Sequence, residues 1–195
     1  MRFIDILETI KKRRSIHQFQ TKEVPESVLE EIFSYGSWAP THYMKEPWNI
    51  KIYQKAGKQL LVDAIIRSYQ RLGMLRSDQT EKTRRSIQAM KNFLIHIPHH
   101  ALIYFPITSD PVRYEEDYAA VCAFIQNSQL AAWSFNVGML WTITPYMHDP
   151  EFAREVELDA DEMKIAAVMQ IGYPEKINKP KERTPIVNKM EFITK

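Results

Sequence analysis

Residues 114–138 read YEEDYAAVCAFIQNSQLAAWSFNVG. The stretch contains no proline, and its first glycine is Gly138 at the very end. Its small and apolar side chains occupy several faces of a helix instead of a single stripe, which is typical of a helix packed on more than one side. We therefore predict one central buried helix here, with the rest of the fold arranged around it.

The segments on either side alternate between helix and strand patterns. Apolar residues spaced at i, i+3, i+4 and i+7 predict an amphipathic helix over residues 2–13. A second helix is predicted to start at Pro25 and to end between Gly36 and Pro40. Further helices are predicted at residues 57–72, 80–95 and 148–158, and strands at 48–54, 100–108, 139–145 and 164–174. With no repeat and no linker, residues 1–195 form one predicted α+β domain.

Composition limits the classes of function. The chain has 195 residues, 45% hydrophobic and 26% charged, which is typical of one globular domain. Because 26 Lys and Arg nearly balance 24 Asp and Glu, nucleic-acid binding is only a minor alternative. The single Cys122 excludes an intrachain disulfide, and no apolar run is long enough for a membrane span or a signal peptide. We expect a cytoplasmic protein without a membrane or nucleic-acid partner.

Glycine is scarce. Only five glycines occur, and they form neither G-x-G-x-x-G nor G-x-x-x-x-G-K. A dinucleotide-binding Rossmann site or a P-loop is therefore excluded. If the protein binds a phosphate, side chains must hold it.

Two cationic segments are candidates for that role. Arg13, Arg14 and Ser15 follow two lysines at the end of the first predicted helix, where forked guanidinium donors and a hydroxyl suit an oxyanion. Lys181 and Arg183 lie two apart in an extended tail (residues 175–195), so their side chains share one face. The alternative for both segments is a solvated surface, with the helix dipole favouring cations at its end.

A loop and three histidines complete the candidates. Residues 38–48, WAPTHYMKEPW, could shape a pocket for a flat ligand or form a rigid turn with core aromatics. His96, His99 and His100 are interpreted as structural instead of metal-ligating, because no carboxylate cluster adjoins them. No nucleophile-base signature is present, so we predict neither a catalytic side chain nor a metal.

Taken in order, these motifs resemble the FMN-dependent nitroreductase family. The resemblance lies in R-R-S at 13–15, A-P…P-W at 39–48, G-x-x-W at 138–141, and G-Y-P at 172–174 followed by K-x-R at 181–183. It spans nearly the whole chain and is closest to the small bacterial nitroreductase-like subgroup. The loop differs from the family's frequent N-x-Q-P-W, because Met44 and Glu46 replace the two amides.

The resemblance implies a fold and a function. The fold is an α+β homodimer with a mixed or antiparallel sheet flanked by helices, a domain-swapped tail and two FMN sites at the interface. The function is an NAD(P)H-dependent flavin oxidoreductase that reduces nitroaromatics, quinones or similar small flat acceptors by ping-pong hydride transfer. The alternative is a non-enzymatic protein that binds FMN to store or sense it.

The resemblance also implies the site residues. It assigns the phosphate to Arg13, Arg14, Ser15, Lys181 and Arg183, the pyrimidine end of the flavin to His17, the strand along the flavin to Trp141, Thr142 and Ile143, and contacts across the interface to Trp38 and His42. Residues 57–95 are expected to roof the pocket, with Tyr43, Tyr69 and Leu72 as lining candidates.

Overall fold

The computed structural model describes residues 6–78 and 80–194. Its helices are α1 (Ile6–Lys12), α2 (Glu26–Gly36), α3 (Gly57–Arg71), α4 (Glu81–His96), α5 (Pro111–Ser134) and α6 (Pro150–Glu155). Single-turn 3₁₀ helices are η1 (His42–Met44), η2 (Pro145–His148) and η3 (Ile186–Lys189), and the strands are β1 (Asn49–Gln54), β2 (His99–Pro106), β3 (Gly138–Thr142) and β4 (Met163–Gly172).

The sheet is antiparallel throughout, with the strand order β1-β2-β4-β3. One irregularity interrupts it, because Ile103 pairs with Ala167 whereas Tyr104 pairs with Ile165. Ala166 is thus an extra residue, and both Ala166 and Ala167 belong to the same core cluster. The α+β class with a central antiparallel sheet is confirmed.

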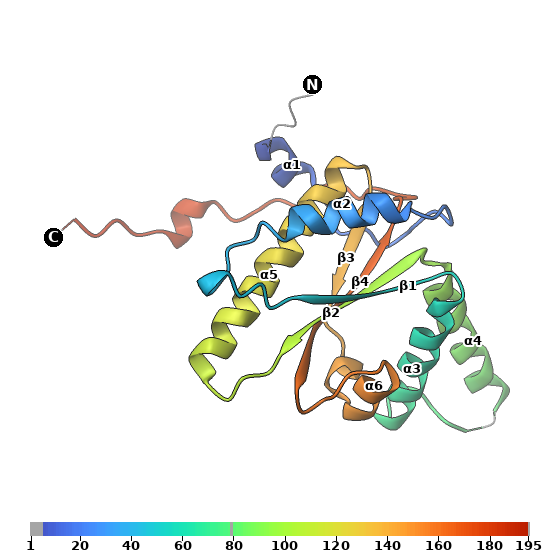
Figure 1. Ribbon diagram of the computed structural model, residues 1–195. Coiled ribbons are helices and arrows are strands. Elements are labelled where there is room, and N and C mark those ends of the chain that lie inside the picture. The colour runs from blue at the N-terminus through green and yellow to red at the C-terminus, as the bar shows by residue number, and fades with distance from the viewer. Residues whose placement is uncertain (1–5, 79, 195) are drawn as a thin grey trace.

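Helices cover both faces of the sheet (Figure 1). One face packs against α2 and α5 through a core that includes Phe33, Phe105 and Phe124. The other face packs against α3 and α6 through a core that includes Leu61 and Phe152. Alternate residues of the inner strands enter the two cores, which is the expected consequence of the two-residue period of a strand.

The predicted central helix is confirmed as α5. It begins earlier than expected because the Asp110 side chain accepts hydrogen bonds from the backbone N–H groups of Val112 and Arg113, and Pro111 suits the first turn. It ends earlier because Asn136 has a positive φ of 57°. Phe124, near its middle, stacks on Phe33 and on Trp48, with ring centroids 6.0 and 5.0 Å away.

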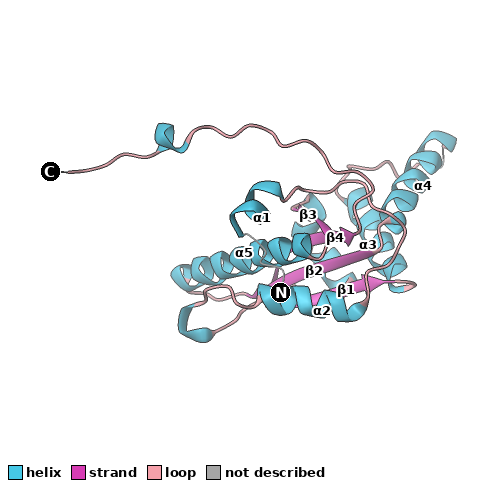
Figure 2. Ribbon diagram, turned by 90° about the horizontal axis from the view of Figure 1, so that it is seen from above, coloured by secondary structure: helices cyan, strands magenta, loops and turns pink. Residues whose placement is uncertain are grey.

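The chain ends differ from the compact body. The predicted helix over residues 2–13 is present as α1 where the chain is described, and residues 1–5 lie outside the described residues. The described part of the tail runs away from the body as an extended segment that η3 interrupts (Figure 2). Its apolar side chains Ile186, Val187, Phe192 and Ile193 are exposed.

Candidate functional site

The cationic run is held at the edge of β3. Helix α1 ends as the backbone N–H of Arg13 donates to the Thr9 carbonyl oxygen. Ser15 then forms a parallel bridge with Met139 of β3. Ile16 is completely buried, and its N–H donates to the Met139 carbonyl at 3.2 Å. This burial of one apolar residue fixes the direction of the preceding arginines.

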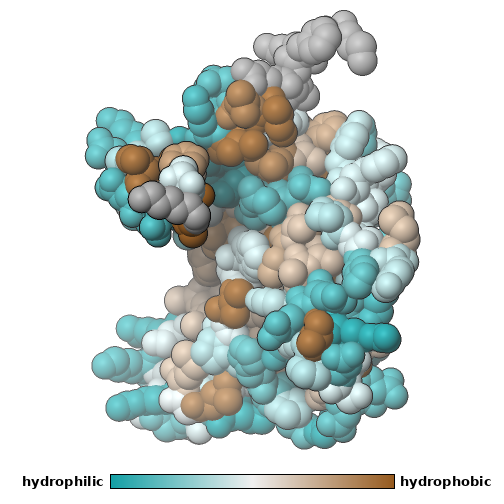
Figure 3. Space-filling view, turned by 90° about the vertical axis from the view of Figure 1, so that its left-hand side faces the viewer, coloured by the Kyte–Doolittle hydropathy of each residue, from teal (hydrophilic) through white to brown (hydrophobic). Residues whose placement is uncertain are grey.

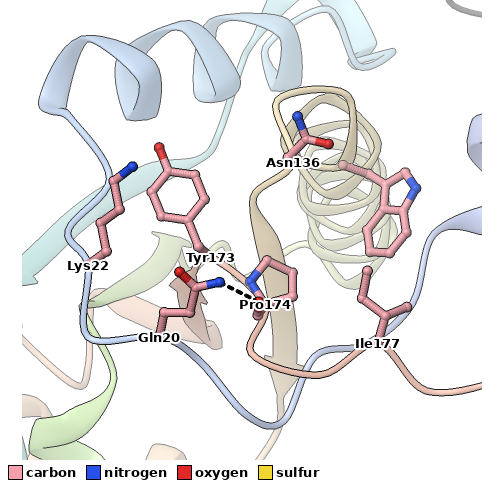
Figure 4. A pocket seen from close by; sticks show the side chains of 7 residues that line it. Gln20, Lys22, Asn136, Tyr173, Pro174 and Ile177 are labelled. Carbon is pink, nitrogen blue, oxygen red and sulfur yellow. Dashed lines mark hydrogen bonds between the residues drawn. The ribbon is translucent and has the colours of Figure 1, made fainter.

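Residues 173–175, where the tail begins, form hydrogen bonds with residues 18–20, which follow the cationic run (Figure 4). The backbone N–H of Gln20 donates to the Tyr173 carbonyl, the N–H of Glu175 donates to the Gln18 carbonyl, and Gln20 Nε2 donates to the Pro174 carbonyl, each at 2.9 Å. Lys22 Nζ lies 4.9 Å from the centre of the Tyr173 ring. These contacts border a cavity of about 370 Å³, and they send the tail back toward α1.

A second cavity, of about 430 Å³, unites the two cationic segments. We call it the cationic cavity. It is lined by Arg13, Arg14, Ser15, Lys181 and Arg183, together with Ile10, Lys11, Gln126 and Pro180. Among these described lining residues none is acidic. The structure therefore brings together all five residues assigned to a phosphate, from positions more than 160 residues apart in the chain.

The charges of this cavity repel one another. Burial, followed by the positive charges of Arg14 and Arg183, lowers the pKa of Arg13. Arg13 Nη1 donates to Gln129 Oε1 at 3.3 Å, and Arg14 Nη1 donates to the Lys11 and Arg13 carbonyl oxygens at 2.6 and 2.7 Å. These acceptors are neutral, so an entering anion would meet uncompensated positive charge and free donors. The donor set fits a phosphate group.

Comparison with known proteins agrees with this geometry. The model of the Nitroreductase family matches residues 10–173. The chain belongs to the nitroreductase family. A curated relative, YfhC of Bacillus subtilis, is named as an NAD(P)H nitroreductase and is 31% identical over 180 residues, which cover 92% of this chain and 89% of YfhC.

Solved structures show the same fold. A nitroreductase-like family protein from Bacillus cereus has a TM-score of 0.88 and 34% identity, covering 99% of this chain and 98% of that chain. The FMN-dependent nitroreductase NfnB of Mycobacterium smegmatis, solved in complex with NADPH, has a TM-score of 0.72 and 16% identity, covering 97% of this chain and 98% of that chain.

The strand residues assigned to the flavin, Trp141, Thr142 and Ile143, do not line the cationic cavity. Trp141 packs against the core on the α5 side, and its indole Nε1 is buried without a hydrogen-bond partner among the described residues. Thr142 Oγ1 donates to the Val168 carbonyl at 2.5 Å, and Ile143 is exposed. His17 is also exposed and does not line the cavity.

The remaining candidates are dispersed. Trp38 and His42 lie in the loop between α2 and β1, and His42 contacts Glu116 of α5. Tyr43 and Leu72 are exposed, whereas Tyr69 is partly buried and packs edge-on against Tyr146 with ring centroids 5.4 Å apart. Within one copy of the chain, these side chains do not meet the cationic cavity.

The sequence did not identify all residues at the cationic cavity. Gln126 lines the cavity and Gln129 accepts from Arg13, both on α5. The signal that could have found them is a pair of amides three residues apart in a largely apolar helix. Ile10 and Lys11 belong to the first predicted helix, but the sequence does not show that they line the cavity. They line it because the tail passes close to them.

His99 and His100 both use Nε2 in hydrogen bonds to the backbone. His99 Nε2 accepts from the Val24 N–H, and His100 Nε2 donates to the Leu94 carbonyl, each at 2.9 Å. No group of three or more His, Cys, Asp or Glu side chains suited to a metal was found among residues 6–78 and 80–194. In the same part of the chain, no helix has the length and apolar character needed to span a membrane.

Proposed function

We propose that this chain is an FMN-dependent NAD(P)H oxidoreductase that binds the FMN phosphate in the cationic cavity. The observation that carries the proposal is the convergence of Arg13, Arg14, Lys181 and Arg183 around Ser15 without an acidic residue among the described lining. Family membership and the relatives named for NAD(P)H, FMN or NADPH support the same cofactors.

Each group of this cavity has a distinct task. The forked guanidinium groups of Arg13 and Arg183 hold phosphate oxygens from opposite sides, and Ser15 adds a hydroxyl donor. Lys181 supplies a compact positive charge. Bound FMN supplies the hydride chemistry, so this chain orients the flavin and sets its electrostatic surroundings. We assign no side chain as a general acid or base.

The proposal includes a homodimer with flavin at the interface. Apolar side chains gather over α1 below the grey N-terminal residues and on the projecting tail (Figure 3). A groove of about 440 Å³ between α1, α2 and α5 is lined by Ile6, Tyr35, Leu130 and Phe135 among others. A second copy would cover these surfaces and receive the tail. Trp38 and His42 of one copy would then contact the flavin held by the other.

The cavity assignment is tested by replacing Arg183 with Ala. A hydrogen bond to a charged group contributes about 1.5–3 kcal/mol, so FMN affinity should fall by roughly tenfold to a hundredfold. Riboflavin, which lacks the phosphate, should lose far less. Lys179→Ala is the matched control, because Lys179 is a tail cation outside the cavity lining. Equal losses of FMN and riboflavin affinity in the Arg183 variant would contradict the assignment.

The non-enzymatic alternative predicts bound FMN without turnover. Steady-state oxidation of NADH and NADPH by the holoprotein, with a quinone and a nitroarene as acceptors, distinguishes the two functions. Turnover with either acceptor supports the oxidoreductase, and flavin binding without turnover supports storage or sensing.

A further inference from the structure

The loop between α2 and β1 is held in one unusual conformation. Tyr43, Met44 and Glu46 have positive φ angles of 51°, 54° and 47°, a region that residues other than glycine rarely adopt. The Glu46 N–H donates to Thr41 Oγ1 at 3.1 Å, and the Lys45 N–H donates to the His42 carbonyl at 3.1 Å. Backbone strain of this kind persists only where the surroundings fix it, and it is concentrated at functional sites.

Both basic side chains of the loop pair with carboxylates of α5, and each remains about half exposed, His42 at 54% and Lys45 at 46%. Lys45 Nζ lies 2.5 Å from Asp117 Oδ2, and the Asp117 side chain is only 7% exposed. His42 Nδ1 lies 2.8 Å from Glu116 Oε2. Glu116 and Asp117 are adjacent on α5, so one turn of that helix engages both groups. The loop is thereby attached to α5, and its basic groups face carboxylates of the same chain.

Apolar side chains make up much of the exposed surface of the loop, and His42, Lys45 and Glu46 are exposed beside them. Trp38, Tyr43 and Met44 are 83%, 92% and 76% exposed. Glu46 is exposed too, and among the described residues no ion pair or hydrogen bond involves its carboxylate. The loop therefore presents two aromatic rings, a thioether, two basic groups that are already paired with carboxylates, and the unpaired carboxylate of Glu46.

We propose that Glu46 makes the acceptor-binding site select by charge, favouring neutral and cationic flat acceptors over anionic ones. This inference rests on the proposed function, which places the loop against the flavin of the second copy. Aromatic and thioether surfaces bind flat rings of any charge. The carboxylate then repels an acceptor that carries its own carboxylate or sulfonate. At a separation of about 7 Å the effect corresponds to roughly threefold to thirtyfold in affinity, depending on the local dielectric constant.

Binding of three unreactive analogues to the oxidised holoprotein tests this inference. Benzamide, benzoate and benzyltrimethylammonium differ in charge, and their dissociation constants are measured from changes in the flavin absorption spectrum. Glu46→Gln keeps the length of the side chain and the backbone hydrogen bond. Glu30→Gln, at an exposed position of α2, is the matched control. A thermal melt of each holoprotein checks that folding is unchanged.

The expected result is specific to charge. In Glu46→Gln, benzoate should bind roughly threefold to thirtyfold more tightly, benzyltrimethylammonium should bind more weakly by a similar factor, and benzamide should be unaffected. Glu30→Gln should leave all three constants unchanged. Absence of binding, or equal changes for the three ligands in Glu46→Gln, would overturn the inference.

Turnover of the matching nitroarenes separates this inference from the proposed function. The series is 4-nitrobenzamide, 4-nitrobenzoate and (4-nitrobenzyl)trimethylammonium. If charge-dependent binding occurs but none of the three is reduced with NADH or NADPH, the selectivity of the site stands and the proposed reduction of nitroaromatics falls. If all three are reduced with a ranking that Glu46→Gln does not alter, the enzyme stands and the role of Glu46 falls.

Discussion

At the scale of single residues, a buried histidine couples folding to pH. Burial lowers the pKa of His100 from 6.5 to about 4, against a smaller opposing effect of its hydrogen bond to Leu94. The unfolded chain therefore takes up the proton first as the pH falls. The contribution to stability is complete above about pH 6.5 and is lost as the pH falls from 6.5 to about 4. The adjacent His99 shifts in the same direction, mainly through burial.

His100→Gln should reduce this loss of stability in acid. The wild type should lose about 3 kcal/mol through His100 between pH 7 and pH 4, and glutamine, which does not titrate, should remove most of that loss. Urea unfolding at pH 7, 5.5 and 4.5 measures the effect. His148→Gln, at an exposed position, is the control and should leave the pH dependence as it was. Parallel curves for wild type and His100→Gln would refute the prediction.

The residues that line the cationic cavity could largely be predicted from the sequence, because they stand in two short cationic motifs and arginine has a recognisable preference for oxyanions. Their contact with a phosphate stays a prediction. Gln126 could not, because its part in the cavity depends on how α5 lies beneath the returning tail. The pairing of Lys45 with a carboxylate of α5 also could not be predicted from the sequence. Its partner Asp117 is far away in the chain, and only tertiary packing brings the two together.

At the scale of elements, close packing at Gly138 joins β3 to the cationic segment, residues 11–15. A Cβ atom on Gly138 would lie 2.5 Å from Ile16 Cγ1 and 2.9 Å from Ile16 Cβ. Gly138→Ala must therefore displace Ile16, and with it the adjacent Ser15 and the arginines before it. We expect a loss of about 1–3 kcal/mol in unfolding free energy, together with weaker FMN binding.

Gly57→Ala is the matched control for this prediction. A Cβ on Gly57 would have no heavy atom within 4 Å, and this glycine is the first residue of α3. Alanine is favoured there by helix propensity, so stability should be equal or slightly higher. Chemical denaturation and FMN titration of both variants check the pair. If Gly138→Ala binds FMN as tightly as the wild type does, β3 does not position the cationic segment.

Elements with a clear hydrophobic period were predicted well, and their boundaries less well. Helix α2 begins one residue after Pro25, which is its N-cap instead of its first helical residue. Helix α5 begins three residues before Tyr114, because the Asp110 side chain caps its first turn. The extra residue Ala166 in β4 had no signal, because a run of apolar residues looks the same with or without a bulge. The positive φ angles of Tyr43, Met44 and Glu46 also had none, because such residues usually avoid them.

At the scale of the whole molecule, the exposed apolar tail predicts a dimer that depends on it. Deleting residues 186–195 removes Ile186, Val187, Met190, Phe192 and Ile193, which are exposed in the single chain. The truncated protein should have a weaker dimer, which dissociates already at higher protein concentrations than the wild type, and it should lose FMN affinity together with dimer stability. Sedimentation velocity with and without FMN provides the measurement. A truncated protein that remains a dimer with its full flavin content would contradict the proposed exchange of tails.

Because Arg13 and Arg183 meet at one cavity, the proposed cofactor site is assembled from two segments that lie far apart in the sequence. The last strand of the sheet, β4, ends at Gly172, so a chain that stops before residue 181 already contains α5 and every strand of the described sheet. Such a chain lacks Lys181 and Arg183, two of the five residues that we assign to the phosphate. We therefore expect flavin capture to be a late event in the maturation of each molecule, and we expect a polypeptide interrupted before residue 181 to bind the cofactor poorly.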